Sequence, residues 1–140
     1  MDHNMFCFQC EQTAGCTGCT SRGVCGKDAQ TAQVQDRLTG ALIGLARAAD
    51  TSPDAGPETW QLMIEGLFAT LTNVNFDPDS LNALAGRVRA EKQRLVPDCA
   101  VCTAPCGRTG DYDLAQLWGA QEDIRSLKSL LLFGSRGMAA

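Results

Sequence analysis

The chain has 140 residues, of which 44% are hydrophobic and 20% are charged, and its formal net charge is −4. This length fits one domain with a core of ordinary size, and the mildly acidic balance lacks the basic stripe that marks nucleic-acid-binding proteins. No apolar stretch approaches the roughly 20 residues of a membrane span, and the first residues lack the basic and apolar regions of a secretory signal, so we expect a cytoplasmic protein.

The first element, residues 1–27, is a loop-rich segment that carries a dense group of cysteines. Its four outer cysteines have the spacing C-x2-C-x8-C-x5-C and are Cys7, Cys10, Cys19 and Cys25. The glycines between them allow the backbone to fold tightly around something small. Because thiolates are soft ligands that select zinc, copper(I) or iron–sulfur clusters, this segment is predicted to bind a metal.

The spacing leaves two kinds of metal centre open. Structural zinc sites favour two C-x2-4-C knuckles, and only Cys7 and Cys10 form one, since five residues separate Cys19 from Cys25. Four thiolates spread over a longer loop suit a 2Fe-2S or a 4Fe-4S cluster, which the spacing favours over zinc. Cys16, inside the loop, is interpreted as a free thiol rather than as a replacement for Cys19.

From about Asp28 the hydrophobic residues recur at three- and four-residue steps, which predicts helices. The first helix ends before Pro57, which is well placed to begin the second. Asp77 and Pro78 give a cap and a start for the third, and a fourth begins near residues 112–114. No convincing strand alternation is present. We therefore expect an all-α fold, a bundle of about four helices over residues 28–140 that follows the cysteine loop.

The core of this bundle is predicted to contain the leucines together with Trp60, Phe68 and Trp118. The end of the chain is unusual, because one continuous helix from Leu114 to Ala140 would be about 40 Å long and would cross the whole domain. Its last turns, Leu130–Phe133, are apolar on every side and therefore need cover. This pattern indicates a chain whose C-terminal end is truncated or is covered by a partner.

A second group of cysteines, Cys99, Cys102 and Cys106, has the spacing C-x2-C-x3-C. It offers three ligands with no histidine nearby, so we interpret it as a cysteine-rich turn in preference to a second metal site. In a cytoplasmic protein, the eight cysteines favour metal binding over a disulfide framework.

The residues around these cysteines carry a family resemblance. The N-terminal run is Met5-Phe-Cys-Phe-Gln-Cys-Glu-Gln-Thr-Ala-Gly15, continued by Gly23-Val-Cys-Gly-Lys27. The second half contains Cys106-Gly-Arg-Thr-Gly-Asp-Tyr-Asp113, Gln121-Glu-Asp-Ile-Arg-Ser-Leu-Lys-Ser129 and Arg136-Gly-Met-Ala-Ala140. Together they resemble the N-terminal portion of the hybrid cluster proteins, also called prismane proteins or hydroxylamine reductases.

The resemblance implies that Cys7, Cys10, Cys19 and Cys25 bind a 4Fe-4S cluster. That cluster would relay electrons from a redox partner protein to a hybrid iron–sulfur–oxygen cluster, where hydroxylamine is reduced to ammonia and water. The hybrid-cluster ligands of the family lie beyond the equivalent of Ala140, and the one histidine here is His3. The chain is therefore expected to be an N-terminal portion, inactive alone, with the remainder of the enzyme as a possible partner. The alternative is a zinc-stabilised helical binding module.

Several neighbours of the ligands have expected roles. Phe6 and Phe8 flank the first ligand and would shield a cluster from water or dock the loop on the bundle. Arg22 and Lys27 would offset the negative charge of a thiolate-bound cluster or remain solvated. The carboxylates Asp111, Asp113, Glu122 and Asp123 are interpreted as helix caps and charged outer surface rather than as acid–base pairs.

Overall fold

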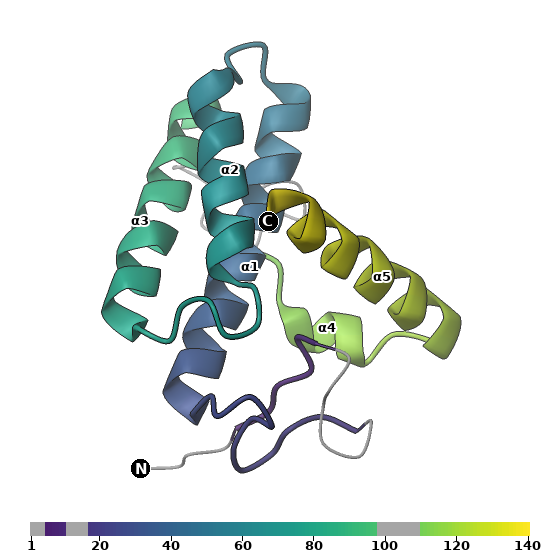
Figure 1. Ribbon diagram of the computed structural model, residues 1–140. Helices are drawn as coiled ribbons and strands as arrows, with labels where there is room; N and C mark the ends of the chain where they lie inside the picture. Colours follow the sequence, from purple (N-terminus) through teal and green to yellow (C-terminus); the bar gives the residue numbers. More distant parts are fainter. Residues whose placement is uncertain (1–4, 11–16, 98–109) are drawn as a thin grey trace.

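The protein is described by a computed structural model that covers residues 5–10, 17–97 and 110–140 (Figure 1). In these ranges the chain forms five helices, α1 Ala29–Thr51, α2 Pro57–Ala69, α3 Pro78–Leu95, α4 Leu114–Trp118 and α5 Glu122–Ala139. The expected all-α class is confirmed: in the same ranges, the β structure is one isolated bridge. None of the helices in the described part of the chain is both long and apolar enough to span a membrane.

The helix starts follow from side-chain caps that the sequence makes visible. The Asp28 carboxylate accepts a hydrogen bond from the Thr31 N–H at 2.7 Å and caps α1. Asp77 caps α3 by accepting from the Asp79 N–H at 3.0 Å, with Pro78 in the first turn. A cap oxygen satisfies a backbone donor that has no partner within the helix. The cap at Asp77 was predicted, whereas the start near Asp28 was predicted from periodicity alone.

Helices α1, α2 and α3 pack side by side around the main core (Figure 1). Leu38 and Leu45 of α1 are fully buried against Leu81 and Val88 of α3. Burial of this kind contributes about 1.5–3 kcal/mol for each large aliphatic side chain and is the main stabilising term of the bundle.

The predicted core of α2 was wrong in part. Trp60 and Phe68 are 47% and 44% exposed, and the buried face of α2 consists of small or medium residues, Thr59, Leu62, Gly66 and Ala69. The reason is close packing: a Cβ on Gly66 would lie only 2.6 Å from the Leu42 side chain of α1. The two helices approach through the glycine, and this rotates the aromatic side chains outward.

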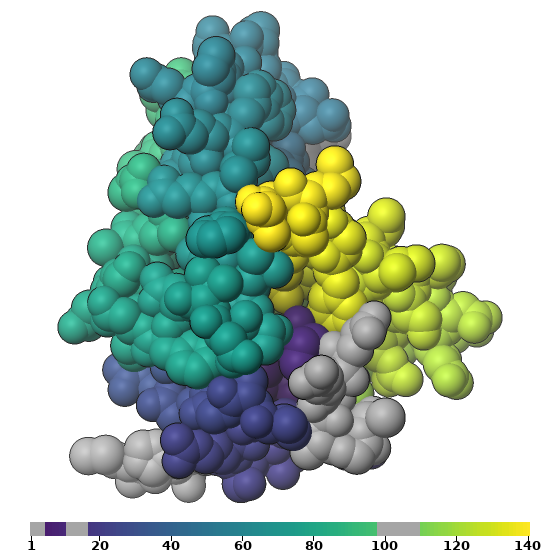
Figure 2. Space-filling view, viewed as in Figure 1, coloured from purple at the N-terminus to yellow at the C-terminus, as the bar shows by residue number. Residues whose placement is uncertain are grey.

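The C-terminal stretch was expected to be one helix and is two. The Gly119 N–H donates to the Ala115 carbonyl at 3.0 Å and closes α4 after a turn and a half, and the chain restarts as α5 at Glu122. Helix α5 then runs obliquely beside α2 (Figures 1 and 2). Its outer face remains exposed, with Leu130 at 65% and Leu131 at 71%.

Residues 110–113, which lead into α4, are held by two helices. The Tyr112 N–H donates to the Gly40 carbonyl of α1 at 3.0 Å. Asp111 forms ion pairs with Arg89 at 2.8 Å and Lys92 at 2.6 Å, both on α3. Asp113 then caps α4 by accepting from the Ala115 N–H, as the capping interpretation predicts. These contacts fix where α4 meets the N-terminal loop.

We predict that Gly40→Ala destabilises the fold, because a Cβ there would lie 2.2 Å from the Tyr112 carbonyl oxygen and the backbone must move. Overpacking of this kind costs roughly 1–3 kcal/mol. Gly86→Ala on the exposed face of α3 is the matched control, since a Cβ there meets nothing. Gly86→Ala should raise the free energy of unfolding by about 0.5–1 kcal/mol, because alanine favours a helix interior over glycine. Urea unfolding measures the free energy of unfolding of both variants, and equal changes would contradict the close approach of Gly40 to the Tyr112 carbonyl.

A second prediction concerns Glu91, which links α2 to α3. The Arg94 guanidinium and then the Thr59 hydroxyl hold the pKa of Glu91 down to about 2. A carboxyl whose folded pKa is depressed stabilises the fold above its unfolded pKa and loses that contribution as pH falls. Glu91→Gln should therefore cost on the order of 1–2 kcal/mol at pH 7, and the cost should shrink between about pH 4.5 and pH 2. A pH-independent difference in unfolding free energy would contradict this.

Candidate metal centre

The N-terminal cysteine segment begins with a short extended stretch that has two different faces. Cys7 and Cys19 form an antiparallel pair, with N–H···O distances of 3.0 and 2.8 Å in the two directions. In such a hydrogen-bonded pair the two side chains project to the same side, and here both thiols are buried beside Met5 and Ala32. The backbone pairing thus brings the first and third predicted ligands together.

The fourth predicted ligand lies on a tight turn. The Gly26 N–H donates to the Gly23 carbonyl at 2.8 Å, and the Gly23 N–H donates to the Lys27 carbonyl at 2.8 Å, so Cys25 is carried inside a closed loop. Gly26 has a φ of +90°, a backbone conformation that is unfavourable for residues with a Cβ. A Cβ on Gly23 would lie 3.1 Å from the Cys25 sulfur. The glycines are therefore required by the turn that presents this thiol.

The predicted ligands differ in exposure. Cys7 and Cys19 are buried, whereas Cys10 and Cys25 are partly exposed. Among the described residues, no three His, Cys, Asp or Glu side chains are close enough together to hold one metal ion. Cys16, Cys99, Cys102, Cys106 and His3 lie outside the described residues, so their predicted roles are not tested.

A polar network lies directly behind Cys7. The Lys27 ammonium, which is 3% exposed, lies 3.9 Å from the Cys7 sulfur and donates to the Gln9 side-chain oxygen at 3.1 Å. The Gln9 amide in turn donates to the Asp36 carboxylate and to the Ala32 carbonyl. Of the two basic residues predicted near the ligands, Lys27 is therefore buried against a thiol, while Arg22 is exposed and donates to the Gly26 carbonyl.

Burial dominates the ionisation of this network. It raises the pKa of the Cys7 thiol, an effect that the Gln9 backbone N–H and the Lys27 charge oppose. It also raises the pKa of Asp36 to about 6, although Gln9, Lys27 and Arg136 favour the carboxylate. The surroundings of Cys7 are thus short of water, and the nearby positive charges favour the thiolate that a metal requires.

Aromatic side chains cover the opposite face of the extended stretch. Residues alternate along it, so Phe6 and Phe8 point away from Cys7 and pack on Trp118 of α4, with ring centroids 5.1 and 4.9 Å from the indole. The Arg125 guanidinium also lies over the Trp118 ring, 4.7 Å from its centroid. Of the two expected roles, the structure shows the docking one: the rings hold the segment on α4, on the face away from Cys7.

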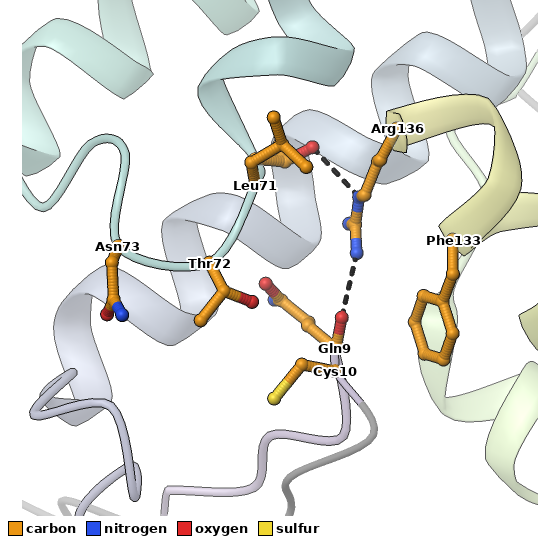
Figure 3. Close-up of a pocket in the computed structure, with 8 residues that line it drawn as sticks. Gln9, Cys10, Leu71, Thr72, Asn73, Phe133 and Arg136 are labelled. Atoms are coloured by element: carbon orange, nitrogen blue, oxygen red, sulfur yellow. Dashed lines mark hydrogen bonds between the residues drawn. The ribbon is translucent and has the colours of Figure 1, made fainter. Parts of the chain in front are cut away.

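A cavity of about 400 Å³ opens beside Cys10 (Figure 3). Residues 70–73 after α2 form one wall, and Phe133 and Arg136 of α5 form the other. Arg136 points from α5 toward the backbone of Gln9 (Figure 3) and donates to the Gln9 carbonyl at 3.0 Å. The α5 helix therefore contacts the cysteine segment through the buried Arg136 side chain, and Leu132 also packs against the cluster that contains Phe8.

The sequence reasoning missed Gln9, Asp36 and Arg136. Gln9 lies between two predicted ligands, but nothing in a glutamine side chain signals an interaction with α1. Asp36 sits one position from the apolar stripe of α1, which is a detectable signal, and no role was predicted for it. Arg136 stands among small residues in Gly134-Ser-Arg-Gly137, and a long cation flanked by glycines is a weak sign of a buried charge.

The donor set fits a thiolate-bound group. The soft ligands, the water-poor surroundings of Cys7 and the buried ammonium beside its sulfur are what an anionic metal–thiolate centre requires.

Comparison with known proteins gives consistent results. The model of the Prismane/CO dehydrogenase family matches residues 5–140. A hydroxylamine reductase of Clostridium perfringens is 39% identical over 98% of this chain, and one of Kosmotoga olearia is 35% identical over 98%. One of Porphyromonas gingivalis is 36% identical over the whole chain. In each case the chain spans only 29% of the length of the relative.

We predict that Gly18→Ala disrupts the Cys7–Cys19 pair. Gly18 has a φ of +102°, and a Cβ there would lie 2.6 Å from the Phe6 ring. Left-handed backbone costs other residues roughly 1–2 kcal/mol, so local opening should rise about tenfold. The measurement is the rate at which a thiol reagent labels Cys7 and Cys19 in metal-free protein. In the control variant Gly86→Ala, Cys7 and Cys19 should be labelled at the parent rate. An unchanged labelling rate in Gly18→Ala would contradict the prediction.

Proposed function

The chain belongs to the Prismane/CO dehydrogenase family, and from that premise we propose that it is the N-terminal, electron-transferring portion of a hydroxylamine reductase. The observation that carries the proposal is the match over residues 5–140, which includes every predicted ligand. The relatives named hydroxylamine reductase align with nearly all of this chain, which supports the same assignment.

The proposed cofactor is a 4Fe-4S cluster held by Cys7, Cys10, Cys19 and Cys25. When bound, such a cluster supplies one-electron transfer. The chain's own residues would then do three things. The Cys7–Cys19 pair and the Gly23–Gly26 turn orient thiols, Lys27 places its ammonium beside the Cys7 sulfur, and the Phe6–Phe8–Trp118 cluster docks the segment on α4.

We place the hydroxylamine-reducing hybrid cluster outside this chain, in the part of the longer relatives that it does not span. The overall reaction adds two electrons and two protons to hydroxylamine, breaks the N–O bond and releases ammonia and water. In this proposal the electrons come from a cytoplasmic redox protein, and the present chain only passes them on. It would therefore not reduce hydroxylamine alone.

The surface of α5 supports a larger assembly. Its outer face exposes a line of apolar side chains, Ile124, Leu127, Leu130, Leu131 and Met138. Large apolar patches of this kind mark contact surfaces. We propose that the remainder of the enzyme, which makes up most of each relative, covers this face.

The test is anaerobic reconstitution of the chain with ferrous iron and sulfide. We expect about four iron atoms and equivalent acid-labile sulfide per chain, with the broad visible absorption of iron–sulfur charge transfer. Cys7→Ser and Cys10→Ser should each lose most of the iron, because thiolate ligation holds the group. Cys16→Ser is the matched control, since it removes a cysteine of the same loop that is not a predicted ligand.

Two results would contradict the proposal. One is a colourless protein that takes up one zinc ion and no iron, which would favour the zinc-stabilised helical module. The other is full iron content in Cys7→Ser or Cys10→Ser, which would exclude these residues as ligands.

A further inference from the structure

Two cations are buried beside the cysteine segment. Lys27 is 3% exposed and Arg136 is 2% exposed. The ion pairs found within residues 5–10, 17–97 and 110–140 involve neither of them. Isolated buried charges cost several kcal/mol each, so a fold that buries two cations has to supply negative charge nearby.

Arg136 is held by oxygens that carry no formal charge. Its guanidinium donates to the Thr70 hydroxyl after α2, the Thr39 hydroxyl of α1 and the Gln9 carbonyl, each at 3.0 Å. The bond to Gln9 joins positions 127 residues apart and fixes the backbone directly before Cys10 (Figure 3). The guanidinium is thus oriented rigidly but is not neutralised by these partners.

Asp36 is the described carboxylate that both cations attract, and it compensates them incompletely. It is half-buried, its oxygen is taken by the Gln9 amide, and burial raises its pKa to about 6. Burial also lowers the pKa of Arg136 to about 10, so the guanidinium stays charged at neutral pH, and the sulfurs of Cys7 and Cys10 lie close enough to favour that charge. The groups placed by geometry to balance the two cations are therefore the thiols of Cys7, 3.9 Å from the Lys27 ammonium, and of Cys10, which directly follows the Gln9 carbonyl that Arg136 binds.

From this geometry we infer that Arg136, acting with Lys27, is a positioning residue that compensates the charge of the thiolate-bound cluster and raises its reduction potential. The inference rests on the proposed function, because it needs a cluster at the four cysteines. Four thiolates bring more negative charge than an iron–sulfur core offsets, and each added electron increases the excess. A buried cation stabilises the reduced form more than the oxidised form, and net charge is one of the factors that set cluster potentials.

The test compares Arg136→Gln, Arg136→Lys and Arg87→Gln in anaerobically reconstituted protein. Arg87 is the matched control, because the same substitution there removes a charge from the exposed face of α3. Iron and sulfide content is measured first, and the potential is then measured by redox titration at low and high salt. We expect Arg136→Gln to shift the equilibrium at least tenfold toward the oxidised cluster, which lowers the reduction potential by about 59 mV for a one-electron couple.

The remaining variants separate charge from packing. Arg136→Lys should recover at least half of the shift, and Arg87→Gln should keep the parent potential. The shift should persist at high salt, since buried charges are poorly screened. A loaded Arg136→Gln variant whose potential equals that of Arg87→Gln would overturn the inference.

If Arg136→Gln takes up no cluster, the iron content of Arg136→Lys is decisive. Iron content restored by the lysine charge supports the inference, and an equal loss of iron in Arg136→Lys overturns it. Lys27→Met should lower the potential in the same direction, and a loaded Lys27→Met variant with the parent potential would also overturn it. Absence of iron from the parent chain itself would instead mean that the proposed function is wrong.

Discussion

The extended stretch from Met5 to Gln9 is held on both faces, and this constraint determines where the cysteines lie. Its backbone pairs with that of Cys19, the side chains of one face pack on α1, and those of the other face pack on Trp118 of α4. Because successive residues alternate between faces, thiol and aromatic side chains cannot exchange sides without losing both contacts. The positions of α4 and of the 110–113 segment that leads into it therefore matter to the candidate metal centre, although they lie about a hundred residues further along the chain.

Charge is the second organising factor. Within the described residues, the fold places an ammonium and a guanidinium in a water-poor region, and the half-buried Asp36 carboxylate is attracted to both. In a protein without a bound anionic group this arrangement would be costly. Around the proposed thiolate-bound cluster the same groups would be stabilising. The contact from Arg136 to the Gln9 carbonyl also joins α5 to the segment that carries the predicted ligands Cys7 and Cys10.

Local sequence signals predicted the parts of the fold that depend on short-range chemistry. The Asp77 cap with Pro78 marked one helix start, Pro57 marked another, and the periodicity that begins at about Asp28 marked the first to within a residue. Hydrophobic periodicity predicted the helices but misjudged the inward face of α2, because the close approach of Gly66 to Leu42 depends on a partner helix. The break at Gly119 was missed for a similar reason, since a glycine in an otherwise helical pattern is often tolerated.

The candidate site divides in the same way. Cysteine spacing pointed to Cys7, Cys10, Cys19 and Cys25, and their role as ligands remains a prediction. The groups around them, Gln9, Asp36 and Arg136, act through contacts between distant segments, which no spacing rule reveals.

The most direct test of the account is Mössbauer spectroscopy of the chain reconstituted with the Mössbauer-active isotope of iron. The account predicts that nearly all of the iron gives the signature of one tetrahedral, sulfur-ligated cluster type. Iron that is mononuclear, or bound by oxygen and nitrogen, would contradict it.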